Sequence, residues 1–177
     1  MKKIIIVCGL IAGLIVSTFM VSSIGFCYAS GNFDGNILIG YASMLLAFSL
    51  VFVGIKNYRD KYHEGHITFG KALQIGIYIS LIASTIYVLV WMVDYYVFVP
   101  DFMEKYNEHI LQQAKENGAS AAEIKDKLKE VEGYAKYYQT PFGVMLLTYL
   151  EILPIGLIVS LISALILKKK NKVTLMS

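Results

Sequence analysis

Charged residues are scarce in this chain, and long parts of it contain none. Only 16% of the 177 residues are charged, whereas 56% are hydrophobic, a balance that excludes an ordinary soluble domain. Cysteine is equally rare. Cys8 and Cys27 lie 19 residues apart on one predicted helix, a separation of roughly 28 Å that prevents a disulfide between them. The composition therefore indicates that lipid is part of the solvent around this protein.

The sequence also lacks the patterns that carry most enzyme chemistry. It contains no nucleophile with a nearby base, no glycine-rich phosphate loop and no nucleic-acid motif. His63 and His66 stand in the sequence HEGH, which is too short for a zinc-protease helix, and His109 stands alone. We therefore expect no enzyme activity, no cofactor, no metal and no nucleic-acid partner.

Four apolar runs dominate the rest of the chain. A hydrocarbon core of about 30 Å needs roughly 20 helical residues, and every run is long enough. A cleaved signal peptide is the alternative for the first run, but such peptides have only about 7 to 15 apolar residues. We therefore predict an all-α integral membrane protein, a four-transmembrane-helix bundle that forms one membrane domain over residues 1–177. Its spans cover about 4–28, 37–55, 72–97 and 141–167.

The basic residues predict the orientation of the four spans. Ten of the 16 lysines and arginines lie in the two termini and the connection between the second and third spans. The other six share residues 100–140 with eight acidic residues. Because cytoplasmic segments are enriched in basic residues, we expect both termini in the cytoplasm of a bacterial inner (plasma) membrane. Near the outer end of the third span, three aromatic residues are expected to form a belt at headgroup level: Trp91, Tyr95 and Tyr96.

The segment between the third and fourth spans is predicted to form an extracytoplasmic amphipathic helical hairpin, over about residues 101–138. Asn117 and Gly118 stop the first helix, and the sequence from Ser120 to Glu123 fits a capping box for the second. Each helix has one apolar face. The two faces consist of Phe102, Tyr106, Ile110 and Ala114, and of Ile124, Leu128, Val131, Ala135 and Tyr138.

Small residues recur along the spans at spacings that place them on one helix face. They include Gly9, Gly13 and Ser17; Gly40, Ala47 and Gly54; Ala72, Gly76, Ser80 and Ser84; and Gly156, Ser160 and Ala164. Such stripes allow close approach of helix backbones in a membrane. We expect them to pack within one bundle, with contact between copies of the chain as the alternative.

Glu151 is the one charged residue inside the fourth span. It lies about ten residues from the outer end of its helix, and therefore roughly 15 Å deep, near the bilayer midplane. An ionised carboxylate there costs at least a few kcal/mol. We expect it to face the bundle interior, to be protonated or to meet a hydrogen-bond donor. The predicted buried polar site consists of Glu151, Tyr87, Ser84 and Thr18, with Ser17 at the same depth and Tyr87 as the preferred donor.

Two interpretations of Glu151 stay open. It is either a structural acid that is hydrogen-bonded within the bundle, or a proton or cation site. Pro154 frees a backbone carbonyl near Leu150, which favours a polar cavity at this point. Asp94 lies among the interfacial aromatic residues, where solvation at the outer boundary explains it.

The stretch Tyr58–Asp60, followed by GHITFGKA at residues 65–72, resembles an uncharacterised bacterial membrane-protein family, the domain of unknown function 4199. The similarity covers nearly the whole chain, including the four spans and the helical outer segment. It implies a cell-envelope location and no known activity, cofactor or catalytic residue. Within this stretch, Thr68 is predicted to cap the third helix, Phe69 to pack at the inner interface and Gly70 to permit close helix approach.

The function expected from the sequence is that of a non-enzymatic interaction or accessory protein of the cell envelope. The sequence predicts an elaborate outer hairpin, and it contains no catalytic pattern. The hairpin is expected to engage an envelope protein or a second copy of the chain, and the lipid bilayer surrounds the spans. The alternative is a small transporter or channel component that uses Glu151 as a midplane carboxylate.

Overall fold

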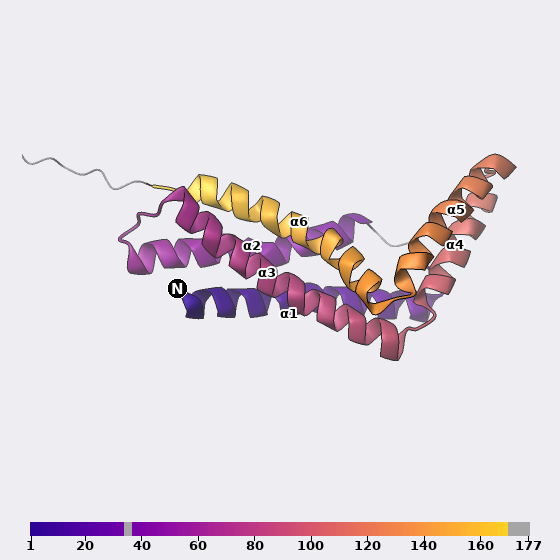
Figure 1. Ribbon diagram of the computed structural model, residues 1–177, viewed down its shortest axis with the longest axis horizontal. Helices are drawn as coiled ribbons and strands as arrows, with labels where there is room; N and C mark the ends of the chain where they lie inside the picture. Colours follow the sequence, from indigo (N-terminus) through magenta and orange to yellow (C-terminus); the bar gives the residue numbers. More distant parts are fainter. Residues whose placement is uncertain (34–36, 170–177) are drawn as a thin grey trace, which may run out of the picture.

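The computed structural model describes residues 1–33 and 37–169, and the described chain is helical apart from short connections (Figure 1). Four of the described helices, α1, α2, α3 and α6, are long and apolar enough to cross a membrane. The predicted all-α membrane fold with four spans is therefore confirmed. The elements are α1 (Lys2–Ser30), α2 (Ile37–Tyr62), α3 (Phe69–Val93), η1 (Asp94–Phe98), α4 (Phe102–Glu116), α5 (Ala121–Tyr138) and α6 (Pro141–Leu167).

The four long helices run side by side, and the α4–α5 hairpin projects from one end of their bundle, the hairpin end (Figure 1). The first residue, the α2–α3 connection and the last turn of α6 lie at the other end, the loop end. α3 packs against both α1 and α6, and α2 contacts all three. Residues 34–36 and the predicted basic-tail residues Lys170 and Lys172 lie outside the described residues.

Two helix boundaries differ from the sequence-based ones. α2 continues to Tyr62 rather than ending near residue 55. Tyr58 still packs into the core, so the buried face of α2 extends one turn further than expected. α3 begins at Phe69 rather than residue 72. There the predicted cap is confirmed, since the Thr68 hydroxyl accepts a hydrogen bond from the Lys71 amide at 3.4 Å.

The helices pack closely where the sequence has glycine. A Cβ atom on Gly9 would lie 2.7 Å from Cβ of Ile82, and one on Gly13 would lie 2.8 Å from Cβ of Ile86. The predicted use of these residues in packing within the bundle is therefore confirmed. Gly40 and Gly70 differ, because a Cβ at either position would meet nothing within 4 Å. The expected close approach at Gly70 is wrong, since Gly70 faces outward on the first turn of α3.

α3 and α6 share the most intimate contact, and it combines small residues with hydrogen bonds. A Cβ on Gly76 would lie 2.8 Å from Cβ of Ser160. The Ser80 hydroxyl donates to the carbonyl of Gly156 at 3.0 Å and lies 3.0 Å from the Ser160 hydroxyl. These polar groups are fully buried, so their mutual bonding satisfies them inside an apolar bundle.

The hairpin has the predicted start and stop signals. Gly118 adopts a left-handed backbone with φ of 73° after α4, and Ser120 and Glu123 form both hydrogen bonds of the capping box before α5. Thr140 caps α6 by accepting from the Gly143 amide at 3.1 Å. The apolar faces of the two hairpin helices cover each other only in part, because Tyr106 and Leu128 are 37% and 39% exposed.

The base of the hairpin is attached to the bundle by aromatic and polar contacts. Trp91 and Tyr95 are buried in an apolar cluster that includes Phe102. They therefore pack inside the protein rather than forming the expected aromatic belt, and of the three only Tyr96 is exposed, at 44%. From α1, the Tyr28 hydroxyl donates to Asp101 at 2.7 Å.

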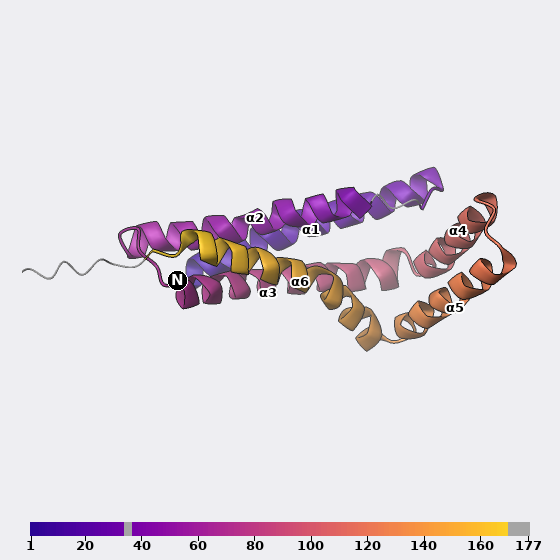
Figure 2. The same ribbon diagram turned by 90° about the horizontal axis from the view of Figure 1, so that it is seen from above.

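The bundle is tight at one end and open at the other. Toward the loop end, side chains of α2 and α3 have no exposed surface, among them Val51, Ile55, Ile75 and Ile79. Toward the hairpin end, the α1–α2 pair diverges from the α3–α6 pair (Figure 2). Side chains only partly fill the space between the two pairs there, and the cavities described below occupy the remainder.

Candidate functional site

Glu151 lies ten residues after Pro141, the first residue of α6, on the part of the helix that borders the open end of the bundle. Its side chain is exposed rather than sealed in the core. Pro154 follows inside the same helix, where its missing N–H removes one backbone hydrogen bond. α6 follows a bent course along its length (Figures 1 and 2).

Three cavities meet at Glu151. The largest, which we call the hairpin cleft, has a volume of about 540 Å³ and separates α4 and α5 from α6. A second, of about 200 Å³, lies where α1, α3 and α6 face one another, and a third, of about 160 Å³, extends between α1 and α2. The hairpin cleft is lined by Phe102, Met103, Tyr106, Asn107, Ile110, Lys127, Glu130, Val131, Tyr138 and Glu151.

The structure brings together only part of the polar site predicted from the sequence. Tyr87 lines the second and third cavities with Glu151, although no hydrogen bond joins the two side chains. Ser84 is fully buried and its hydroxyl has no partner among the described residues, but it borders none of the three cavities. Thr18 lies apart, exposed and donating to the carbonyl of Leu14 at 2.8 Å. Counting depth along a helix does not determine which face a residue occupies, and Thr18 satisfies its hydroxyl on its own helix.

Residues from the hairpin, which sequence reasoning did not connect to Glu151, complete the site. Tyr138 and Phe102 each line both the hairpin cleft and the second cavity. Burial, followed by the nearby Glu151 carboxylate, raises the pKa of Tyr138 to about 12. The phenol is therefore neutral at physiological pH and contributes a hydroxyl and an aromatic ring without charge. The one feature of the sequence that could have connected Tyr138 to the site is its position two residues before Thr140, the cap of α6.

Glu151 forms no hydrogen bond or ion pair with any other residue that the structure describes. The hydroxyl of Thr148, three residues earlier on the same helix, already donates to the carbonyl of Val144 at 2.7 Å. An accessible carboxylate beside aromatic rings attracts cations and accepts hydrogen bonds. The arrangement is therefore suited to binding a ligand.

Asp94 occupies a different position from the one expected. It begins η1, a π-helix in which the Val99 amide donates to the Asp94 carbonyl at 2.9 Å. Its side chain is only 7% exposed, and Oδ2 has no hydrogen-bond partner among the described residues. Solvation at the boundary is therefore the wrong explanation, because Asp94 is buried within the protein.

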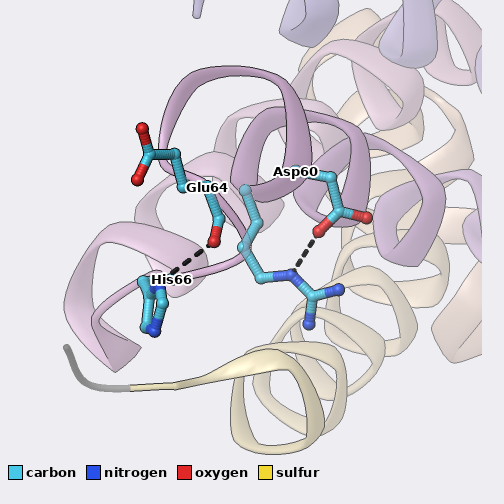
Figure 3. A network of polar contacts seen from close by, with 4 residues as sticks. Asp60, Glu64 and His66 are labelled. Atoms are coloured by element: carbon cyan, nitrogen blue, oxygen red, sulfur yellow. Dashed lines mark hydrogen bonds and ion pairs between the residues drawn. The ribbon is translucent and has the colours of Figure 1, made fainter. Parts of the chain in front are cut away.

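Polar residues at the loop end form local contacts. Arg59 pairs with Asp60 at 2.7 Å, and a ring nitrogen of His66 lies 3.0 Å from the carbonyl of Glu64 (Figure 3). His63 lies 3.0 Å from the Tyr58 hydroxyl. Within residues 1–33 and 37–169, no group of three or more potential ligands is placed to hold a metal ion.

A protein-family model described as "Protein of unknown function (DUF4199)" matches residues 8–169 of the chain. No curated protein and no solved structure matches the chain. The matched range includes α1 from residue 8 onward, all of α2, α3 and α6, the hairpin and Glu151.

Proposed function

The chain belongs to the DUF4199 family of proteins of unknown function, and we propose that it is a non-enzymatic accessory protein of the cell envelope that takes up a binding partner in the hairpin cleft. One observation carries the proposal. The cleft is open, and its base holds Glu151, a carboxylate with no partner among the described residues. A carboxylate near the middle of a span costs free energy unless something compensates it, so a bound partner gives it a role.

The proposed orientation places the hairpin outside a bacterial inner membrane and both termini in the cytoplasm. Its support is the excess of basic residues at the loop end, together with the eight acidic residues that accompany the six basic ones between residues 100 and 140. With this orientation, the hairpin cleft lies on the outer side of the membrane, and its base extends to Glu151 within the membrane-spanning helix α6.

Carriage of a proton or cation through Glu151 is the second candidate. The observation in its favour is that three cavities share this residue. Against it, side chains without exposed surface fill the loop-end half of the bundle, including Val51, Ile55 and Ile75. A carrier would have to open that half, whereas a binding protein needs no such change. In reconstituted vesicles, a flux that Glu151→Gln abolishes would favour the carrier.

Cysteine protection tests whether the cleft is occupied in the membrane. Tyr106→Cys places a thiol in the cleft wall, and Leu128→Cys places one on the same hairpin outside the cleft. Both are made with Cys27→Ser, because Cys27 is partly exposed, whereas Cys8 is buried. We expect a small maleimide to react with Tyr106→Cys several-fold more slowly in native membranes than in purified protein. Leu128→Cys should react at the same rate in both.

A photo-crosslinking amino acid at Met103, another cleft residue, identifies what occupies the cleft. A crosslinked adduct with a protein would indicate a protein partner or a second copy. Protection of Tyr106→Cys without a protein adduct would indicate a small ligand. Equal labelling of Tyr106→Cys in membranes and in purified protein would overturn the proposed role of the cleft.

A further inference from the structure

Most of the residues that line the hairpin cleft are aromatic or apolar, and Glu151 lines it from α6. Phe102 and Tyr106 stack with their ring centroids 5.9 Å apart and an interplanar angle of 9°, which makes a continuous aromatic wall. Tyr138 adds a third ring, and Met103 and Ile110 add flexible apolar surface. Aromatic faces attract cations that lie within about 6 Å of the ring centroid, and the attraction grows when water is excluded.

The charges around the cleft favour a positive ligand. Lys127 and Glu130 line it from α5, and both are exposed. Together with Glu151 on α6, the lining holds two acids and one lysine, so acidic side chains outnumber basic ones in the cleft. An anion there would face the carboxylate without compensation, and a neutral ligand would leave that carboxylate unpaired.

The size and depth of the space favour an organic cation rather than a metal ion. A volume of about 540 Å³ lies in the range of roughly 300 to 1,000 Å³ that small organic ligands occupy. Beyond Glu151, the cavity between α1 and α2 presents the apolar side chains Val16, Phe19 and Met20. The described residues hold no cluster of metal ligands.

We propose that the hairpin cleft binds a hydrophobic organic cation, which pairs its positive charge with Glu151 and rests its apolar groups on Phe102, Tyr106 and Tyr138. This inference rests on the proposed function of the cleft and names the chemical class of its ligand. A substituted ammonium or phosphonium ion has the required chemistry, because it combines a diffuse positive charge with apolar substituents that suit aromatic walls.

The single tryptophan of the chain provides a direct readout. Trp91 lines the second cavity with Glu151, and its ring centroid lies 5.3 Å from that of Phe102 in the cleft wall. Full-length protein in phosphatidylcholine nanodiscs is titrated with tetraphenylphosphonium, and the fluorescence of Trp91 is followed. Tetraphenylborate, which has the same shape and the opposite charge, is the matched control ligand. We expect saturable quenching by the cation and none by the anion.

Variants separate the acid from the aromatic wall. Glu151→Gln should weaken binding of the cation by about tenfold or more, since it removes the carboxylate that all three cavities share. Glu132→Gln, which removes an exposed acid of the same hairpin outside the cleft lining, should change it less than about threefold, because an exposed charge contributes little. Tyr106→Leu, which keeps bulk but removes the aromatic face, should weaken binding several-fold even if Glu151→Gln fails to fold.

The outcomes separate this inference from the proposed function. Equal binding of the cation by the wild type and Glu151→Gln, or equal binding of tetraphenylborate, would overturn the organic-cation inference. If Tyr106→Cys were nevertheless protected in native membranes, the cleft would still bind a partner, of a different chemical class. Loss of that protection would remove both proposals.

Discussion

Ile67 and Lys169 exchange two backbone hydrogen bonds, although they lie in different connections of the chain. The Ile67 amide donates to the Lys169 carbonyl at 3.0 Å, and the Lys169 amide donates to the Ile67 carbonyl at 2.9 Å. Ile67 stands just before α3, and Lys169 stands just after α6. This bridge ties together the loop ends of the two helices that pack most closely, and Ile67 itself is buried in the core.

Replacing Lys169 with proline should loosen the loop end. Proline removes the amide that donates to Ile67, while the extended conformation of Lys168, with φ of −58° and ψ of 129°, already suits a following proline. We expect a loss of about 0.5 to 1.5 kcal/mol in the free energy of unfolding, measured as a lower melting temperature in detergent. Lys169→Ala keeps the backbone bonds and should melt like the wild type. Equal melting of Lys169→Pro and Lys169→Ala would show that the bridge contributes nothing.

Two glycines of α3 should respond oppositely to alanine. Gly76 faces Ser160, whose Cβ would lie 2.8 Å from an added methyl, so Gly76→Ala should destabilise the protein by about 1 to 3 kcal/mol. Gly70 faces open space in the first turn of the same helix, so Gly70→Ala should be neutral or stabilise by about 0.4 to 1 kcal/mol. Chemical unfolding of both variants in one detergent provides the comparison. A neutral Gly76→Ala would mean that α3 and α6 lie farther apart.

The ionisation of Tyr138 should report the carboxylate beside it. Its pKa is raised from 10 to about 12 by burial and then by Glu151, so the neutral phenol is favoured in the fold. That contribution to stability is complete below pH 10 and is lost as the pH rises from 10 through 12. Glu151→Gln should lower the pKa of Tyr138 while burial keeps it above 10. Phenolate absorbance, taken as the difference from Tyr138→Phe, measures it. An unchanged value would place the carboxylate elsewhere.

The proposed orientation predicts which thiols are reachable from outside the cell. Lys125→Cys lies on α5 of the hairpin and Lys61→Cys on the last turn of α2 at the loop end, and both positions are exposed. With Cys27→Ser in both, a membrane-impermeant maleimide should label Lys125→Cys in intact cells and Lys61→Cys only after lysis. The reverse pattern would invert the topology and place the hairpin in the cytoplasm.

The helices were predictable because their signals are local. Long uncharged runs require membrane spans, and capping groups such as Thr68, Ser120 and Thr140 mark the helix starts at which the structure places them. The end of α2 was less predictable, since Tyr58 is buried by tertiary packing within a stretch that is otherwise charged and polar. Local sequence does not contain that contact.

The site was only half predictable, because it depends on how the hairpin folds against the bundle. The depth of Glu151 and Tyr87 follows from helix rise, and the two residues do border the same cavities. The contributions of Tyr138 and Phe102 require the hairpin to lie against α6, which no spacing along the chain reveals. Thr18 shows the same limit. Its depth along α1 placed it beside Glu151, but its hydroxyl lies on another face of α1 and bonds to its own helix.

The five residues of η1 determine the direction in which the hairpin leaves the bundle. A π-turn holds one residue more than an α-helical turn, and each residue rotates a helix by about 100°. Deleting one residue between Asp94 and Phe98 would restore α-helical phase and swing everything that follows around the axis of α3. Phe102 would then leave Trp91, and the aromatic wall would no longer face Glu151. The one extra residue of the π-turn thus sets the orientation of the whole hairpin relative to the bundle.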